Sequence, residues 1–451
     1  MAGIESIPSA RRLVLSLRDM GYDFAQAVAD VVDNAVTAKA TVVHVHITFD
    51  GNASWVRIAD NGTGMTPAVL REAMRFGSSA RDYGSDDLGK FGLGLKTASL
   101  SQARYLAVAS RWNKSRAEIH GYCWDIDHID RTDRWEIMPL SREGFSAEVR
   151  DPLRDHPGTV VVWRRLDRLL GYSHPYGESS RKRLLTMCRA VEDHLAMVFH
   201  RFLSGEAGRR KLRIFVNDNP VAPWDPFCRS EDRTKAMRPA TLTLDDDGLK
   251  GEVLVEPYIL PPLDGFSSRE AADKASGPAK WNQQQGFYIY RAGRLIQSGG
   301  WCHMRAVDEH LKLARVAVSF KPNLDEAFKV NVAKMRVLLP ASLKSLVEEL
   351  IAPTIRLARE TYDRKVPAAT AAGSSGDAGG RISKTLPTAS IEQAAAGKSP
   401  PPASRAAGEP DRLSLAEWSQ LLLSKTRPKE TPIVRKVLGR LSESQEHPND
   451  A

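Results

Sequence analysis

Residues 89–99 carry the sequence GKFGLGLKTAS, the stretch that most narrows the possible folds of this chain. It ends a segment rich in Gly, Ser and Asp (residues 77–94), which we expect to be a long loop, and it opens a predicted helix. Glycines at a helix start expose backbone N–H groups, and Lys90 and Lys96 add positive charge, so the stretch predicts a phosphate cradle. It is not a P-loop, because GxxxxGK[ST] is absent, and it does not fit the dinucleotide fingerprint.

A second polar group lies upstream, on a helix predicted from its N-cap Asp23 to about Ala38. Asp30 and Asn34 are four residues apart, so both project from one face of that helix, among apolar neighbours. An amide oxygen can bind Mg²⁺, and a carboxylate can orient and deprotonate a water molecule. For this pair alone, a solvated polar face is the simpler interpretation.

A third motif, DNGTGM at residues 60–65, follows a strand predicted at residues 55–58. A carboxylate at a strand end, here Asp60, can accept a hydrogen bond from an exocyclic amine such as adenine N6. Gly62 and Gly64 permit a tight turn and close approach of a ligand to the backbone. The alternative is an ordinary Asp-Asn-Gly turn, which is common in proteins.

The order of these pieces, followed by Gly158-Thr159 at the start of a strand, resembles the GHKL ATPase superfamily of gyrases, heat-shock chaperones, histidine kinases and MutL. The GKFGLGLKTAS form is more similar to the MORC and bacterial MORC-like branch. The resemblance covers roughly residues 20–165 and extends more weakly to about 345. It implies an α/β protein: a two-layer α/β sandwich that binds ATP (the Bergerat fold) at residues 1–170, then a transducer-like α/β domain at residues 180–365.

The resemblance also implies roles for single residues. Asn34 matches the asparagine that binds Mg²⁺, and Asp30 occupies the position of the usual glutamate general base, one methylene shorter. Asp60 matches the aspartate that binds the adenine amino group, and Thr159 the threonine that supports it. The remaining implied nucleotide contacts are the glycine turn, the wall of the base and the ATP lid: Gly62, Gly64, Met65, Gly89, Lys90, Phe91, Gly92, Leu93, Gly94 and Lys96.

The family's second domain normally sends a basic residue to the γ-phosphate. The sequence FKVNVAK at residues 328–334 fits that segment, and Lys334 is the predicted sensor. Lys329 is the alternative, and a solvated surface lysine is the simplest interpretation of either.

Periodicity predicts a helix at residues 181–202, a strand at 212–216, further strands at 251–258, 286–290 and 316–320, and a helix at 341–362. Residues 286–296 form a predicted strand, turn and strand with arginines at the turn, which either contact nucleic acid or have a structural role.

The C-terminal part of the chain has a different composition. Residues 366–411 are rich in Ala, Gly, Ser and Pro and predict a disordered linker, and residues 412–451 predict a short helical tail. His44 and His46 share a face of a strand, but without a third ligand at suitable spacing no zinc site is predicted.

Charge and composition narrow the class of protein. The 451 residues include 64 Lys and Arg against 55 Asp and Glu, a net charge of +9 that favours an acidic partner. The four cysteines have no CxxC spacing, so no disulfide framework is predicted. Because no signal peptide and no membrane-spanning apolar run are evident, we expect a cytoplasmic protein without membrane contact.

We therefore expect a slow, Mg²⁺-dependent ATPase that acts as a switch, with ATP and Mg²⁺ as ligands and a nucleotide-dependent homodimer as the working form. The leading function is an ATP-gated clamp or remodeler on DNA. A chaperone-like protein remodeler and a nucleotide-gated scaffold with little hydrolysis are the alternatives, and the C-terminal tail is a candidate binding segment for a protein partner.

Overall fold

The structure is a computed structural model that describes residues 6–19, 21–77, 94–112, 118–141, 145–169, 176–206, 210–246, 248–278, 280–330 and 337–364. All of these belong to one compact unit, Met1–Thr370. Most of the lid segment, Lys334 and the whole predicted tail lie outside the described residues.

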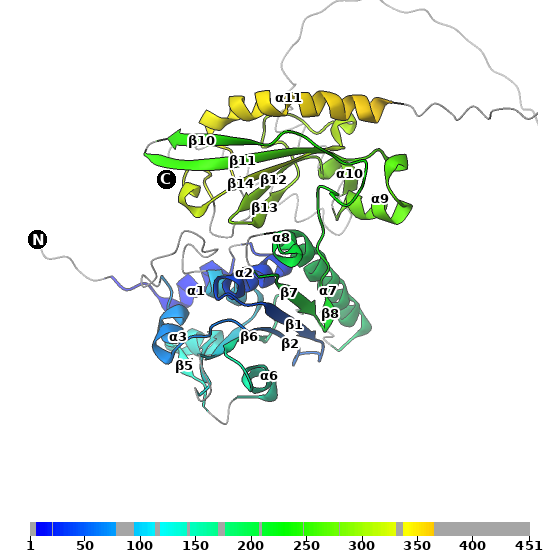
Figure 1. The fold of residues 1–451 in the computed structure, drawn as a ribbon. Helices are drawn as coiled ribbons and strands as arrows, with labels where there is room; N and C mark the ends of the chain where they lie inside the picture. Colours follow the sequence, from blue (N-terminus) through cyan, green and yellow to red (C-terminus); the bar gives the residue numbers. More distant parts are fainter. Residues whose placement is uncertain are drawn as a thin grey trace, which may run out of the picture. The chain divides into compact units, whose positions relative to one another are not determined.

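An eight-stranded sheet forms the N-terminal part of this unit (Figure 1). Neighbouring strands in this sheet are antiparallel, except that β1 and β7 run parallel to each other. The strand order is β5 (Met138–Pro139), β4 (His120–Asp125), β3 (Tyr105–Arg111), β6 (Gly158–Arg164), β2 (Trp55–Asp60), β1 (Val42–Thr48), β7 (Arg213–Val216) and β8 (Asn219–Pro220).

Helices pack on one face of this sheet around the buried helix α2 (Phe24–Thr37). Asp23 caps α2 in a reciprocal capping box with Gln26, as its position predicts, and the apolar residues of α2 face the core. The other helices of this part are α1 (Ala10–Arg18), α3 (Pro67–Met74), α4 (Gly94–Gln102), α5 (Ile126–Thr132), α7 (Glu178–Val198) and α8 (His200–Ser204). The short helix α6 (Ala147–Arg150) lies on the other side of the strands from α2 (Figure 1).

The second sheet has six strands and is covered by the long helix α11 (Ala341–Asp363), which lies along β10 and β11 (Figure 1). Its order is β10 (Ala240–Asp246), β11 (Leu249–Ile259), β14 (Ala314–Phe320), β12 (Gly286–Arg291) and β13 (Arg294–Ser298), with β9 (Lys235–Ala236) paired to β11. Two short helices, α9 (Arg269–Ser276) and α10 (Lys280–Gln283), precede β12.

The structure confirms the α/β class and differs from expectation in two places. The helix predicted at 181–202 is divided at Phe199 into α7 and α8. The strand predicted at 212–216 forms as β7, but it pairs with β1 and not with the second sheet. The first sheet therefore continues to Pro220, beyond the boundary expected between residues 170 and 180, because a distant strand completes its edge.

Among the residues that the structure describes, no helix combines the length and apolar character needed to cross a membrane.

Candidate nucleotide-binding site

Asp60 ends β2 at a point where three strands are in register. It lies opposite Thr159 of β6, and Thr159 in turn lies opposite Ser110 of β3. The Asp60 Oδ1 accepts a hydrogen bond of 2.7 Å from the backbone N–H of Gly62. Burial raises the pKa of Asp60 to about 6, while the backbone N–H groups of Gly62 and Thr159 act in the opposite direction. The carboxylate is thus a preformed acceptor at the sheet edge.

Ser110 is a site residue that the sequence analysis missed. Its hydroxyl donates to the carbonyl of Gly158 (2.8 Å), lies 3.1 Å from Thr159 Oγ1 and accepts the backbone N–H of Met65 at 2.9 Å. It therefore holds the turn after Asp60 against β3 and β6. The signal in the sequence was a polar residue near the end of an apolar strand, and the structure shows that residue to be 0% exposed.

Two glycines, Gly64 in this turn and Gly158 at the start of β6, cannot carry a side chain. Gly64 has φ +65°, and a Cβ there would lie 1.9 Å from the carbonyl oxygen of Arg111. A Cβ on Gly158 would lie 2.0 Å from the carbonyl oxygen of Asp60. The glycines thus allow the turn to pack directly on the backbone of neighbouring strands.

Asp30 and Asn34 occupy successive turns of α2, as predicted. Asp30 is 3% exposed, and its Oδ2 accepts a hydrogen bond of 3.0 Å from the hydroxyl of Tyr22. Burial and the neighbouring Asp30 charge raise the pKa of Tyr22, so its hydroxyl stays protonated as a donor. Asn34 is exposed, and its Nδ2 donates to the backbone carbonyl of Asp30 at 3.0 Å.

The first residue of α4 lies against this acid. A Cβ on Gly94 would lie 2.7 Å from the Asp30 Oδ2, so the last glycine of the predicted phosphate cradle is in direct contact with the predicted general base. At the other end of α2, the backbone N–H of Thr63 donates to the carbonyl of Ala38 at 3.0 Å. One helix therefore connects the lid motif to the turn after Asp60.

Lys96 lies 2% exposed within α4. Its Nζ donates to the carbonyl of Ala73 at 2.9 Å, and burial lowers its pKa to about 8, with Glu72 acting in the opposite direction. These contacts connect α4 to α3, and a phosphate contact by Lys96 stays a prediction. Lys329, the alternative sensor, is exposed and has φ +47°. The predicted contacts Gly89, Lys90, Phe91, Gly92, Leu93 and Lys334 lie outside the described residues.

An ion pair that sequence reasoning missed joins the second sheet to α2. Arg294 Nε of β13 lies 2.7 Å from Asp33 Oδ1, and the two side chains are 5% and 1% exposed. Arg291 makes a similar buried pair with Asp325 at 2.6 Å. The arginines predicted at the turn of residues 286–296 are therefore buried in ion pairs, which favours the structural interpretation over contact with nucleic acid.

Comparison with known proteins agrees with this geometry. Residues 22–159 match the family described as histidine kinase-, DNA gyrase B- and HSP90-like ATPases. Protein MICRORCHIDIA 5 of Arabidopsis thaliana is 35% identical over 91 residues, which are 19% of this chain and 13% of that protein. The DNA mismatch repair protein MutL of Treponema pallidum is 26% identical over 184 residues, 39% of this chain and 28% of that protein.

ATPase morc-1 of Caenorhabditis elegans is 32% identical over 85 residues, which are 19% of this chain and 10% of that protein. The matched part of the chain thus spans between 10% and 28% of the length of these three relatives. The family match begins at Tyr22 and ends at Thr159, two residues that contact Asp30 and Ser110, so it encloses the site described above. The resemblance drawn from the motifs is confirmed: over residues 22–159 this chain carries a GHKL ATPase domain, similar to those of MORC and MutL proteins.

Proposed function

We propose that this chain binds ATP with Mg²⁺ along α2 and hydrolyses it slowly, as a nucleotide-driven switch. The observation that carries the proposal concerns the carboxylates of Asp30 and Asp60: α2 carries the first, and the end of α2 contacts the turn that follows the second. Asp30 contacts Gly94 at one end of the site, and Ala38, eight residues on, contacts the turn after Asp60 at the other. At 1.5 Å per residue these ends are roughly 12 Å apart, a span that suits an extended nucleotide.

The adenine end is assigned to Asp60. The amino group of adenine would donate to the Asp60 carboxylate, which Gly62 and Thr159 already orient. Such a bond to an ionised acceptor is shorter and stronger than one between neutral groups. The close packing of Gly64 and Gly158 on neighbouring backbone supports the turn that follows Asp60.

The donor set at the phosphate end fits Mg²⁺. Because the Asn34 nitrogen is bonded to the Asp30 carbonyl, the amide oxygen is the atom that remains for an ion. Amide and carboxylate oxygens are hard ligands of the kind that Mg²⁺ prefers, and the ion when bound would neutralise phosphate charge. Asn34 would hold it, and Asp30 is placed to act on a water molecule.

Hydrolysis then depends on Asp30. The Asp30 carboxylate takes a proton from the attacking water, whose oxygen forms a bond to the γ-phosphorus while the bond to the β-phosphate oxygen breaks, giving ADP and phosphate. The Tyr22 hydroxyl orients the Asp30 carboxylate and, by donating to its Oδ2, occupies one of its acceptor positions. The short side chain and this bond support slow turnover, and they also favour the second candidate, a nucleotide-gated scaffold with little hydrolysis.

The larger role we propose is an ATP-gated dimeric clamp or remodeler on DNA. It is supported by the net charge of +9, by the Asp33–Arg294 pair that links α2 to the second sheet, and by similarity to a protein named for DNA mismatch repair. Cytoplasmic location and a protein partner for residues 412–451 belong to the same proposal.

The test is to measure ATP binding and phosphate release for the wild type, Asp30→Asn and Asn34→Ala. We expect Asp30→Asn to bind ATP normally but to release phosphate at least about 100-fold more slowly, since general-base catalysis contributes that much or more. Asn34→Ala should weaken Mg²⁺-dependent binding. The exposed Asp193 of α7 offers a matched control, Asp193→Asn. Equal binding and hydrolysis in all variants would show that the site is wrongly assigned, whereas a wild type that binds but does not turn over would identify the scaffold.

A further inference from the structure

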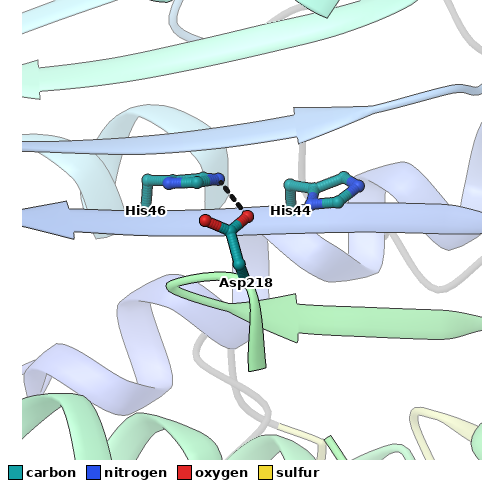
Figure 2. A group of neighbouring side chains, drawn as sticks. All are labelled: His44, His46 and Asp218. Carbon is teal, nitrogen blue, oxygen red and sulfur yellow. Dashed lines mark ion pairs between the residues drawn. The ribbon is translucent and has the colours of Figure 1, made fainter. Parts of the chain in front are cut away.

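Two histidines and an aspartate meet on the face of β1 that is opposite to α2. His44 and His46 project side by side from β1, and Asp218 reaches toward them from the turn between β7 and β8 (Figure 2). One ligand atom from each residue can be chosen so that all three lie within 4.8 Å of one another, and His46 Nε2 is 3.4 Å from Asp218 Oδ1. The third ligand that the sequence lacked is supplied by the pairing of β7 with β1.

Hydrogen bonds hold the turn that carries Asp218. The side chain of Asn217 accepts the backbone N–H of Ile47 at 2.8 Å and donates to its carbonyl at 3.3 Å. The backbone N–H of Asn217 donates to the carbonyl of Val45 at 2.9 Å. The turn is therefore fastened to β1 between and beyond the two histidines, which fixes the backbone that carries Asp218.

The histidines are also held. The ring of His44 stacks on Phe215 of β7 with centroids 4.8 Å apart and planes 10° from parallel. Both imidazoles are half-buried, whereas the Asp218 side chain is 78% exposed and free to rotate toward them. Tetrahedral zinc sites bring ligand atoms to about 3.4 Å from one another, so side-chain rotations that draw these three groups in from within 4.8 Å would close them around an ion.

The positive charge of nearby arginines bears on which class of metal ion the group could bind. Arg57 of β2 lies opposite His46, and its positive charge acts on both histidines, while that of Arg213 acts on His44. An ion bound mainly by carboxylate charge, such as Ca²⁺ or Mg²⁺, is disfavoured here. Imidazole nitrogen binds borderline transition metals through a directed bond, which tolerates neighbouring cations better.

We propose that His44, His46 and Asp218 bind one divalent transition-metal ion of the zinc class, with water as a fourth ligand. The ion joins β1 to the β7–β8 turn, the last part of the first sheet before the chain passes to the second. It reinforces the edge of the ATPase sheet, and it is separate from the nucleotide site because it lies on the opposite face.

The experiment uses the full chain after treatment with a chelator. Titration with Zn²⁺ followed by calorimetry should give one ion per chain, and His46→Ala and Asp218→Asn should each weaken binding by at least about 10-fold. Asparagine tolerates the positive φ of 66° at position 218, so Asp218→Asn tests the ligand without disturbing the turn. Co²⁺ in place of Zn²⁺ should give the visible absorption of a four-coordinate site in the wild type and not in His46→Ala or Asp218→Asn.

His310→Ala is the matched control, since His310 pairs with Asp363 at 2.6 Å in an exposed pair that belongs to no group of three possible metal ligands among the residues that the structure describes. It should bind Zn²⁺ as the wild type does, and Mg²⁺ should produce no comparable heat. The proposal is overturned if the wild type shows no saturable Zn²⁺ binding, if His46→Ala and Asp218→Asn keep the wild-type affinity, or if His310→Ala loses as much. ATP affinity should be the same in all these variants, so failure here is distinguishable from failure of the nucleotide site.

Discussion

In the proposed nucleotide site, recognition of the base depends on the protonation state of a single residue, Asp60. Its pKa lies at about 6, against an ordinary value of 3.8, so burial favours the protonated form. The folded state therefore binds a proton more tightly than the unfolded chain, and the stability that this contributes is lost as the pH rises through about 6. A ligand that donates a hydrogen bond to the ionised carboxylate instead favours the deprotonated form of Asp60.

We therefore expect adenosine affinity to fall as the pH is lowered through about 6, by up to about 10-fold per pH unit. Adenosine is the proper probe because it has no phosphate group that titrates in this range. Asp60→Asn should bind more weakly and show no such dependence, because its amide does not ionise. A pH profile that is equally steep in the variant would assign the titration to another group.

At the scale of elements, β13 and α2 are coupled by the Arg294–Asp33 pair. Removing the arginine leaves Asp33 buried without its ion-pair partner from β13, and breaking a buried pair in this way costs about 3–5 kcal/mol. Arg294→Met should lower the free energy of unfolding by that amount. It should also alter phosphate release, since Asp33 lies on α2 between Asp30 and Asn34.

Urea unfolding measures the first effect, and the double variant Asp33→Leu/Arg294→Met should recover most of the loss because no buried charge remains. Arg305→Met is the comparison, since Arg305 pairs with Glu348 at 3.1 Å where the side chains are 25% and 53% exposed. That change should cost no more than about 1 kcal/mol. If the two single variants lose equal stability, the Asp33 pair has no special role.

At the scale of the whole molecule, the proposed clamp predicts that nucleotide state controls assembly. With Mg²⁺ and a non-hydrolysable ATP analogue, sedimentation should reveal a dimer, and the affinity for DNA should be higher than without nucleotide. That affinity should fall steeply as the salt concentration is raised, because phosphate contacts release counterions. With ADP the chain should be a monomer. Asp60→Asn should not respond to the analogue at matched concentration, and a mass independent of nucleotide would contradict the clamp.

Local pattern was enough to predict much of the first sheet and its central helix. The helix predicted from Asp23 to about Ala38 is present as α2, and the strand predicted at residues 55–58 is present as β2, each within one or two residues. Pro67 begins α3, where the fixed φ of proline suits the first position of a helix. These features depend on interactions between residues close in sequence, which hydrophobic period and capping rules describe directly.

The sequence by itself determined the α/β class, the ATPase motifs and the positions of Asp30 and Asp60 on a helix and at a strand end. Only the tertiary structure decided which groups those residues meet: Ser110 beside Thr159, Gly94 against Asp30, Arg294 on Asp33, and Asp218 beside His46. Each of these contacts joins segments that are distant along the chain. Strand register and helix packing set such contacts, and both arise from burial of the whole apolar surface and not from any local run of residues.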